Sequence, residues 1–333
     1  MKAVLIKGYS KKIQTHLSDV PLPKTGDNEV LIKVKAAAVN PLDLLILTGS
    51  IRLIYNYSMP LILGNECSGI VEKVGSKVNQ FKEGDAVYTR LPIKKAGAFA
   101  EYIAVEENAV AKMPSNCDFT SAAAIPLTGL TAYQAITEEL QAKRGDTLLI
   151  TGGSGSFGQM AVPIAKSFGL NVIVTGNKRS CEQFLKIGTD RYIDYKSKNY
   201  WETLSEINYV IDTLGPSEFY NELSVLKNGG CLLSLKTGPN RAFAEKNKFP
   251  IMKKLLFTLA GAKYDKAAQK QGKKYKFMFV RSDGAQLRKI TEIVEKNNII
   301  PTVDPHIFSL EQTNEALQFI GKGHTNGKVV IRF

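Results

Sequence analysis

The sequence predicts an α/β protein that combines a doubly wound parallel sheet with a β-rich domain. Short runs of β-branched residues, separated by turn residues, fill the first 110 residues, and apolar strands alternate with helical segments further along. Strands that alternate with helices are typical of a parallel sheet covered by helices on both faces. The length of 333 residues is enough for about two domains.

The β-rich part is expected to hold short strands at close spacing, which is typical of a small barrel or sandwich. These strands are residues 3–6, 30–38, 68–74, 86–89 and 100–105. A helical segment follows at 121–140, with Thr120 or Ser121 as its capping residue.

The alternating part begins with a continuous apolar strand. The expected strands are residues 147–151, 171–175, 191–194, 209–212, 231–235 and 277–280, and the expected helices are 157–168, 181–187 and 286–296. Gly169 and Gly188 end the first two of these helices. Residues 236–276 interrupt the alternation, and 328–332 form a last strand.

Basic residues exceed acidic residues by thirteen, and most of this excess lies in the interrupting segment. Between Arg241 and Lys276 the chain has eleven basic and two acidic residues. Such a segment can contact phosphates, and its aromatic rings can stack on the bases of RNA. We prefer the alternative of a solvated, partly helical face with buried rings, because charge runs are usually solvated. The rings concerned are Phe243, Phe249, Phe257, Tyr264 and Tyr275.

The composition, with 44% hydrophobic and 23% charged residues, excludes a disordered or collagen-like chain. No apolar run approaches the roughly 18 residues of a membrane helix, and the first residues do not resemble a signal peptide. The four cysteines, Cys67, Cys117, Cys181 and Cys231, are too far apart in sequence for a Cys-x-x-Cys pair. We therefore expect free thiols, a cytoplasmic location and no membrane partner.

The strongest chemical signal is the segment ITGGSGSFG at residues 150–158. Its Gly153, Gly155 and Gly158 form a G-x-G-x-x-G pattern that follows an expected strand and opens an expected helix, as a dinucleotide site requires. In such a site the glycines permit the tight turn, the approach of the pyrophosphate and close packing of helix on strand. The helix N-terminus offers unpaired N–H groups to the phosphates. A purely structural turn is the alternative interpretation.

The residues after the second expected strand favour NADP over NAD. An NAD site has an acidic residue there for the ribose hydroxyls, but the chain reads Gly176-Asn177-Lys178-Arg179-Ser180. Lys178 and Arg179 attract a 2′-phosphate through charge-assisted hydrogen bonds, whereas a carboxylate would repel it. The alternative is that both residues only begin a solvated helix.

Several motifs together resemble the medium-chain dehydrogenase/reductase superfamily over essentially the whole chain. They are GNECSGIVEKVG (64–75), GDAV (84–87), AGAFAEYIAV (96–105), AAAIPLTGLTAYQAI (122–136), the glycine-rich turn and GKVVI (327–331). The resemblance implies a GroES-like barrel with most substrate contacts and a Rossmann domain for the cofactor. With the expected elements it places the GroES-like domain at 1–121, the Rossmann domain at 122–285 with the basic insert 236–276, and the return to the GroES-like domain at 286–333.

The resemblance also bears on whether the chain binds a catalytic zinc ion. In the zinc branch of the superfamily a Cys precedes the first helix, a His follows the glycine of G-H-E, and a second Cys lies just before the T-G-L segment. Here residues 40–43 contain no Cys, Asn65 stands at the His position, and 122–128 contain neither Cys nor His. Because a catalytic zinc needs three protein ligands, we expect no metal.

Without a Lewis acid, simple alcohols are poor substrates, whereas quinones and α,β-unsaturated carbonyls are already electrophilic. Such substrates need mainly alignment with the cofactor and stabilisation of an oxyanion. The chain most resembles the zinc-less quinone oxidoreductase (ζ-crystallin-like) group, on the strength of VNPLD (39–43) and FMFVRSDGAQL (277–287). This implies an NADPH-dependent reductase of quinones, enals or enones that forms a homodimer. A dinucleotide sensor with little turnover is the alternative.

The resemblance supplies two sets of site residues. The cofactor set is Thr128 near the nicotinamide ribose or amide, Gly153, Ser154, Gly155, Ser156, Phe157 and Gly158 around the pyrophosphate, and Asn177, Lys178, Arg179 and Tyr195 around the 2′-phosphate. The catalytic set is Asn40, Asp43, Tyr55 and Tyr57. Asp43 has the alternative of only capping its helix, and the tyrosines of only packing in a loop. Water can supply the proton after hydride transfer, so no general acid is assigned.

Overall fold

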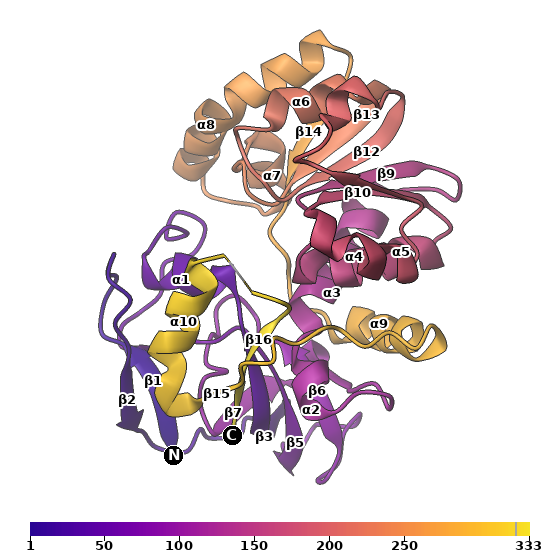
Figure 1. Cartoon of the computed structure of the whole chain (residues 1–333). Helices are drawn as coiled ribbons and strands as arrows, with labels where there is room; N and C mark the ends of the chain where they lie inside the picture. Colours follow the sequence, from indigo (N-terminus) through magenta and orange to yellow (C-terminus); the bar gives the residue numbers. More distant parts are fainter. Residues whose placement is uncertain (324) are drawn as a thin grey trace. The chain divides into compact units, whose positions relative to one another are not determined.

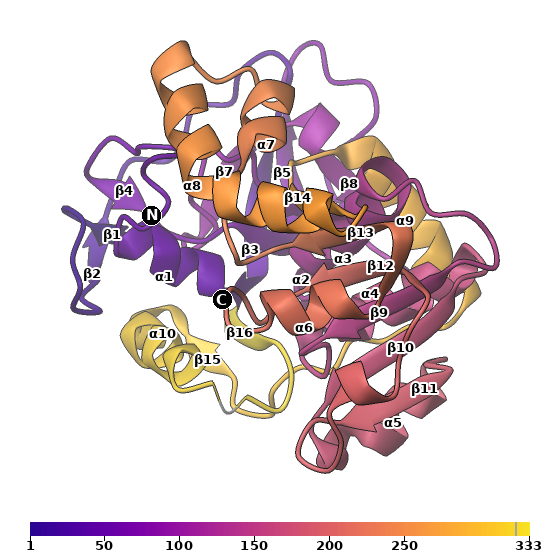
Figure 2. The same cartoon turned by 90° about the horizontal axis from the view of Figure 1, so that it is seen from above.

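The computed structural model describes residues 1–323 and 325–333, and His324 lies outside the described residues. The chain forms two compact units (Figures 1 and 2). Unit 1 consists of two segments, Met1–Leu130 and Arg281–Phe333, and unit 2 is the single segment Thr131–Val280. The α/β fold class predicted from the sequence is confirmed.

Unit 1 is built on two sheets whose strands are mainly antiparallel. One sheet has the strand order β2-β1-β4, and the other has the order β15-β16-β3-β5-β6-β8 with β7 also paired to β3. The strands are β1 (Lys2–Ile6), β2 (His16–Asp19), β3 (Glu29–Val39), β4 (Leu61–Ile62), β5 (Glu66–Val74), β6 (Ala86–Arg90), β7 (Tyr102–Glu106), β8 (Val110–Lys112), β15 (Phe308–Ser309) and β16 (Val329–Arg332). The strand β3 joins the chain's two segments, because it pairs with β5, β7 and β16.

In the part of the chain that the structure describes, five helices accompany these strands, and the third of them continues past Leu130 into unit 2. They are α1 (Pro41–Leu47), α2 (Phe119–Ala123), α3 (Pro126–Gln134), α9 (Gly284–Lys296) and α10 (Thr313–Gly321). The single helix expected at 121–140 is instead α2, α3 and a π-helical turn, Ala135–Glu139. A proline is favourable in the first turn of a helix and unfavourable in its interior. Pro126 therefore begins the new helix α3 instead of continuing α2. The cap of α2 is Asp118, whose side chain accepts from the Ser121 backbone N–H.

Unit 2 is a parallel, doubly wound sheet with the strand order β11-β10-β9-β12-β13-β14. In sequence order this is 3-2-1-4-5-6, the Rossmann arrangement. The strands are β9 (Thr147–Thr151), β10 (Asn171–Gly176), β11 (Arg191–Asp194), β12 (Ile207–Asp212), β13 (Leu226–Ser234) and β14 (Lys274–Phe277). The helices are α4 (Ser156–Ser167), α5 (Cys181–Lys186), α6 (Phe219–Ser224), α7 (Arg241–Lys246) and α8 (Ile251–Lys270). The strand expected at 277–280 is wrong, because β14 ends at Phe277.

The basic insert forms α7, α8 and β14, and α8 packs against β14. The Tyr264 and Tyr275 rings are buried against Phe219, with ring centroids 4.7 Å and 5.6 Å from it. Phe243 and Phe257 are buried as well, so these rings are held in the core and cannot stack on bases. The expectation of a helical face with buried rings is confirmed for these four rings, whereas Phe249 is only half-buried. None of the helices in the described part of the chain, α8 included, is long and apolar enough to span a bilayer.

The chain passes from unit 1 to unit 2 after Leu130 and returns to unit 1 at Arg281, rather than at the expected boundaries 121/122 and 285/286. The helix α2 belongs to unit 1, because it packs against β3 and β5 on the small side chains of Ala36 and Ala38. The Ser282 hydroxyl donates to the Arg90 carbonyl of β6, and α9 packs against β8. Tertiary contacts, which the local pattern does not reveal, thus decide both boundaries.

Candidate functional site

The glycine-rich turn joins β9 to α4, and its glycines differ in their surroundings. Gly155 caps α4 and is exposed, and a methyl group on it would meet no heavy atom within 4 Å. A methyl group on Gly158 would lie 1.7 Å from the carbonyl oxygen of Gly153. Gly158 therefore serves close packing of the helix, and Gly155 leaves the helix N-terminus open to an anion. An open, N–H-lined turn of this kind fits the pyrophosphate of a dinucleotide.

The basic pair follows β10 in a 3-10 turn, Lys178–Ser180. The Asn177 side chain accepts a hydrogen bond from the Arg179 backbone N–H at 3.2 Å, and the Tyr192 hydroxyl donates to the Asn177 carbonyl at 2.7 Å. These bonds hold the turn in place. The side chains of Lys178 and Arg179 are exposed, and no carboxylate in the described residues pairs with either. Both cations are therefore free to bind an anionic ligand.

A pocket of about 490 Å³ lies at the carboxyl ends of the strands of unit 2. Ligands of doubly wound sheets bind at this end, where the strand order reverses. Two predicted cofactor residues, Ser154 and Tyr195, line the pocket, and the other predicted residues of unit 2 do not. The remaining lining residues, which the sequence did not suggest, are Gly152, Thr175, Gly176, Lys198, Tyr200, Trp201, Leu214, Ser217 and Glu218. Lys198 adds a further cation, and the Tyr200 and Trp201 rings add apolar surface for an aromatic base.

Two carboxyl groups are buried next to the glycine-rich turn. Glu222 on α6 accepts a hydrogen bond from the Thr151 hydroxyl at 2.5 Å, and Thr151 is the last residue before the turn. Burial, reinforced by the nearby Asp212 carboxylate, raises the pKa of Glu222 to about 9. Glu222 is therefore protonated at neutral pH. Asp212 is held by the backbone N–H groups of Leu214 and Gly215 and by the hydroxyls of Ser234 and Thr237.

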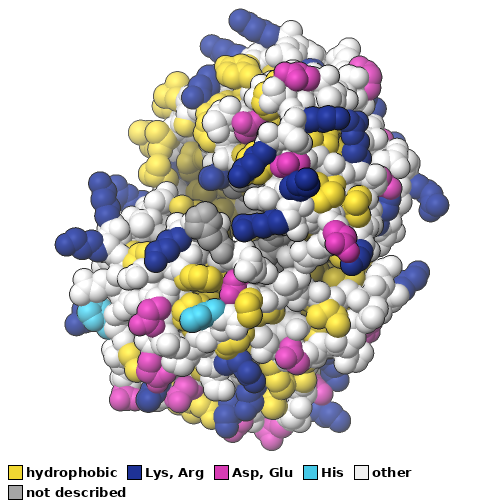
Figure 3. Space-filling model, in the orientation of Figure 1, with side chains coloured by type: hydrophobic (Ala, Val, Ile, Leu, Met, Phe, Trp, Pro, Cys, Tyr) yellow, Lys and Arg dark blue, Asp and Glu magenta, His cyan; other side chains and the backbone are white. Residues whose placement is uncertain are grey.

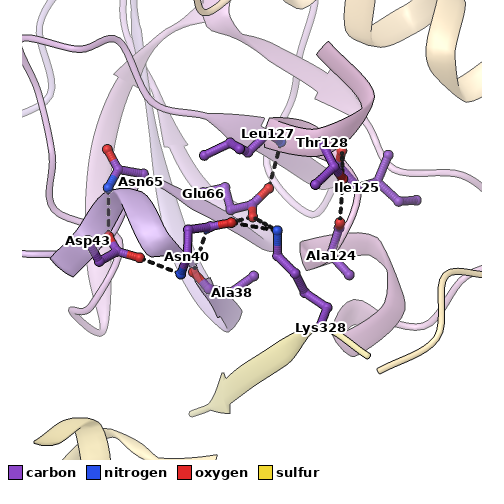
Figure 4. Close-up of polar contacts among 10 residues, drawn as sticks. All are labelled: Ala38, Asn40, Asp43, Asn65, Glu66, Ala124, Ile125, Leu127, Thr128 and Lys328. Carbon is purple, nitrogen blue, oxygen red and sulfur yellow. Dashed lines mark hydrogen bonds and ion pairs between the residues drawn. The ribbon is translucent and has the colours of Figure 1, made fainter. Parts of the chain in front are cut away.

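Two of the predicted catalytic residues, Asn40 and Asp43, belong to a buried polar network of unit 1 (Figure 4). The Asp43 carboxylate accepts from the Asn65 side chain at 2.6 Å and from the Asn40 backbone N–H at 2.7 Å. The second bond caps α1, so Asp43 does cap its helix. Burial raises the pKa of Asp43 to about 7.

Asn40 connects Asp43 to a buried ion pair. Its Nδ2 donates to Glu66 Oε1 at 2.8 Å, and its Oδ1 accepts from Lys328 Nζ at 2.6 Å. Lys328 Nζ lies 2.8 Å from Glu66 Oε1, and the other Glu66 oxygen accepts from the Leu127 N–H at 2.6 Å. The polar ends of the Asn40, Glu66 and Lys328 side chains point toward one another in Figure 4. The network thus joins the two chain segments that form unit 1.

Tyr55 and Tyr57 lie between α1 and β4, with ring centroids 4.8 Å apart. Tyr57 is buried, and its hydroxyl has no hydrogen-bond partner among the described atoms. Burial raises the pKa of Tyr57 above its usual range. Thr128, a predicted cofactor residue, lies on α3 in unit 1, and its hydroxyl donates to the Ala124 carbonyl at 3.2 Å.

Arg90 at the end of β6 is a buried cation that the sequence did not suggest. Its Nη1 donates to the Leu91 carbonyl, whereas Nε and Nη2 have no partner within the described structure. Burial lowers the pKa of Arg90 to about 10, and the Tyr57, Glu66 and Asp43 side chains act on its charge in the opposite direction. Among the buried side chains of unit 1 that the structure describes, three donors thus lack a partner, two on Arg90 and one on Tyr57, and the two side chains interact electrostatically.

Two family models match the chain. The alcohol dehydrogenase GroES-like domain matches residues 26–115, and the zinc-binding dehydrogenase model matches 187–331. The chain is 32% identical over 323 residues to 2-methylene-furan-3-one reductase from Solanum lycopersicum, which covers 94% of this chain and 74% of that protein. It is 28% identical over 354 residues to the mitochondrial NAD(P)H oxidoreductase RTN4IP1 of Dictyostelium discoideum, covering 99% of each. The solved structure of the quinone oxidoreductase from Coxiella burnetii is similar, with a TM-score of 0.84, 26% identity and coverage of 100% and 99%.

The second model's description implies a zinc ion, and the residues of unit 1 do not fit one. A zinc site needs at least three Cys, His or carboxylate ligands. Asn40 and Asn65 present neutral amides at two of the positions concerned, and the carboxylate of Glu66 already has the Lys328 ammonium as its cation. Within residues 1–323 and 325–333, no cluster of three or more His, Cys, Asp or Glu side chains is arranged to hold a metal.

Proposed function

The chain belongs to the medium-chain dehydrogenase/reductase superfamily of nicotinamide-dependent oxidoreductases, among its quinone oxidoreductase-like members, and on that premise we propose that it uses NADPH to reduce quinones or α,β-unsaturated carbonyls without zinc. The observation that carries the choice of NADPH is the exposed Lys178–Arg179 pair after β10, with no carboxylate partner in the described residues. Charge-assisted hydrogen bonds from this pair stabilise a 2′-phosphate.

The turn at Gly155 and the pocket beside it support the rest of the cofactor site. Backbone N–H groups at the start of α4 bind the pyrophosphate, and Gly155 leaves them uncovered. Tyr200 and Trp201 offer their rings to the adenine in the pocket of about 490 Å³. The cofactor, when bound, supplies the hydride.

The substrate class is supported by the ion pair in unit 1 and by the names of two relatives. The Lys328 ammonium is bonded to Glu66 and to Asn40, which lies at one of the positions that hold a ligand in the zinc branch, and this supports a reaction without a Lewis acid. Quinones and conjugated carbonyls react without such help. Two relatives are named 2-methylene-furan-3-one reductase and quinone oxidoreductase.

The carbonyl oxygen of such a substrate gains negative charge as the hydride arrives, and donors that point at it lower the barrier. We assign this contact to the Tyr57 hydroxyl and to Nε and Nη2 of Arg90, the buried side-chain donors without a partner in the described part of unit 1. Asn40 and Asp43 then act as positioning residues, because their side-chain polar atoms are engaged in the network.

The cofactor choice is tested by steady-state kinetics with NADPH and NADH on a panel of quinones and enals. The double variant Lys178→Ala/Arg179→Ala should raise KM for NADPH about 10- to 100-fold, the loss of one to two charged hydrogen bonds, and leave KM for NADH unchanged. Lys186→Ala is the matched control, because Lys186 is exposed on α5 and forms an ion pair with Glu182. A preference for NADH, or no oxidation of NADPH across the panel, would refute the proposal.

Independence of zinc is tested by chelation and metal analysis. Activity should survive treatment with a chelator, and the purified protein should hold no stoichiometric zinc. Loss of activity on chelation that added zinc restores would overturn this part.

Assembly as a homodimer and a location in the cytoplasm stay predictions. Sedimentation velocity and a fluorescent fusion would decide them.

A further inference from the structure

Helix α8 carries an apolar face that stays exposed in the structure. Its residues are Ile251, Met252, Leu255, Leu256 and Leu259, which are 82%, 76%, 54%, 43% and 68% exposed. Their spacing along twenty helical residues places them on one side of the first half of α8. In Figure 3 hydrophobic side chains gather on the surface where Figure 1 draws α8. We call these five residues the α8 face.

The α8 face is not needed to hold the helix on unit 2. A different side of α8, with Phe257, Gly261, Tyr264 and Ala268, is buried in the core of the unit. Contiguous exposed apolar side chains are unfavourable in water, and a protein that keeps them generally uses them for binding.

Cations without an acidic partner in the described residues lie on α8 and on the segments next to it in sequence. Within the described structure, no carboxylate pairs with Lys248, Lys254, Lys266, Lys270 or Lys274. Lys253 and Lys263 lie over the rings of Phe249 and Tyr264 rather than on an acid. Most of the insert's positive charge is therefore available to an external anion.

We propose that the α8 face docks on an anionic lipid surface. Apolar side chains flanked by lysines on one exposed helix are the features of a helix that lies in the membrane interface. Each lysine near an anionic leaflet adds about 1 kcal/mol of attraction, and the apolar side chains enter the boundary of the acyl region. None of the five residues of the α8 face belongs to the proposed cofactor or substrate sites, and the inference does not rest on the proposed activity.

Two other occupants explain less of the surface. A second copy of the chain on this face would bring two strongly basic inserts together, and juxtaposed like charges oppose association. RNA would pair with the lysines but would leave five apolar side chains in water, and four of the five rings of the insert that could stack on bases are buried. Anionic lipid satisfies the apolar side chains and the lysines together.

The proposal is tested by co-sedimentation of the full chain with vesicles of phosphatidylcholine containing phosphatidylserine, and with vesicles of phosphatidylcholine alone. Binding is expected only to the first, and it should weaken as salt is added. Leu255→Glu/Leu259→Glu should abolish it, and Lys266→Gln/Lys270→Gln should weaken it about 30-fold, the equivalent of two lysine contacts. Leu185→Glu is the matched control, because Leu185 is 48% exposed on α5, outside the α8 face.

Circular dichroism and thermal unfolding establish that each variant is folded, which the exposure of the substituted side chains predicts. Absence of binding at low salt, or binding that Leu255→Glu/Leu259→Glu leaves intact, would overturn the proposal. So would a self-associated wild-type chain that the same double variant converts to a monomer without vesicles, since a second copy would then cover the face. RNA binding that Lys266→Gln/Lys270→Gln weakens while vesicles do not bind would assign the surface to nucleic acid instead.

Discussion

Arg90 is a buried guanidinium with two N–H donors that lack partners in the described residues of unit 1. A buried donor without an acceptor costs about 1–3 kcal/mol, and such sites are typical of places where a ligand supplies the missing partner. The Tyr57 hydroxyl is also a buried donor without a partner in the described residues, and the Tyr57 and Arg90 side chains interact electrostatically. A substrate oxygen would satisfy both.

Removing the Tyr57 hydroxyl should therefore slow the reaction rather than weaken cofactor binding. We expect Tyr57→Phe to lower kcat about 10-fold or more, by loss of one donor to the developing oxyanion, with the NADPH dissociation constant unchanged in a fluorescence titration. Tyr55→Phe is the matched comparison, because Tyr55 packs against Tyr57. Equal effects of the two substitutions would contradict the role given to Tyr57.

The ion pair of Glu66 and Lys328 leads to a second prediction at the scale of single residues. Both side chains are at most 3% exposed, so Lys328→Met leaves a buried carboxylate without its cation. We expect a loss of about 3–5 kcal/mol in the free energy of unfolding, measured by urea denaturation. Adding Glu66→Gln to Lys328→Met should recover part of this loss. A double variant less stable than Lys328→Met would disprove the charge argument.

The family resemblance suggested Asn40 and Asp43, but nothing in the sequence gave Lys328 and Arg90 a role. Lys328 reaches Glu66 only because β16 pairs with β3, and Arg90 stands opposite Glu66 through the register of β5 and β6. Such neighbours depend on strand pairing, which spacing along one segment does not reveal.

At the scale of elements, strands and helices with a clear local apolar pattern were predicted well. Strands that are very short, or whose apolar residues are few, were not. The strands β9 and β11 match the expected residues, and the glycine-rich turn lies between β9 and α4 as expected. The strands β4 and β15 have two residues each, too few for any alternation to show. The strand β14 was misplaced because its lysines obscure the apolar residues that face the core.

The packing of α6 against β12 buries Glu222 and leads to a pH prediction. Because its pKa rises from 4.5 to about 9 on folding, the folded chain binds one more proton than the unfolded chain between these pH values. This contribution to stability therefore falls as pH rises through that window, by at most about 1.4 kcal/mol per pH unit.

Glu222→Gln removes this proton linkage. The stability of Glu222→Gln relative to wild type should thus rise with pH between about 5 and 9, measured by urea denaturation at several pH values. A difference that does not vary with pH would show that Glu222 is not protonated in the fold.

At the scale of the whole molecule, the two units differ in how the chain builds them. Unit 2 is one uninterrupted segment that holds all six strands of its sheet, whereas unit 1 needs both Met1–Leu130 and Arg281–Phe333. We expect the fragment 131–280 to unfold cooperatively and to bind NADPH, and the fragment 1–130 to aggregate, because it lacks β16 and Lys328. Calorimetry and light scattering check this, and a soluble, cooperative 1–130 fragment would contradict it.

The fold class and the nature of both domains were predictable because the hydrophobic period changes along the chain and the glycine-rich turn has its expected context. The unit boundaries were not, since α2 and Ser282 join unit 1 through tertiary contacts. The net charge was visible in the sequence, but its meaning depended on the α8 face, because only the fold shows which apolar side chains remain exposed.

The ion pair between Lys328 and Glu66 also means that unit 1 can be completed only at the end of translation. A ribosome adds Glu66 before the whole of unit 2 and adds Lys328 after it, so unit 2 can fold while Glu66 still lacks its cation. The nascent unit 1 holds an unneutralised carboxylate and an unpaired edge of β3 throughout this interval. The domain that the ribosome begins first is therefore the one that is completed last.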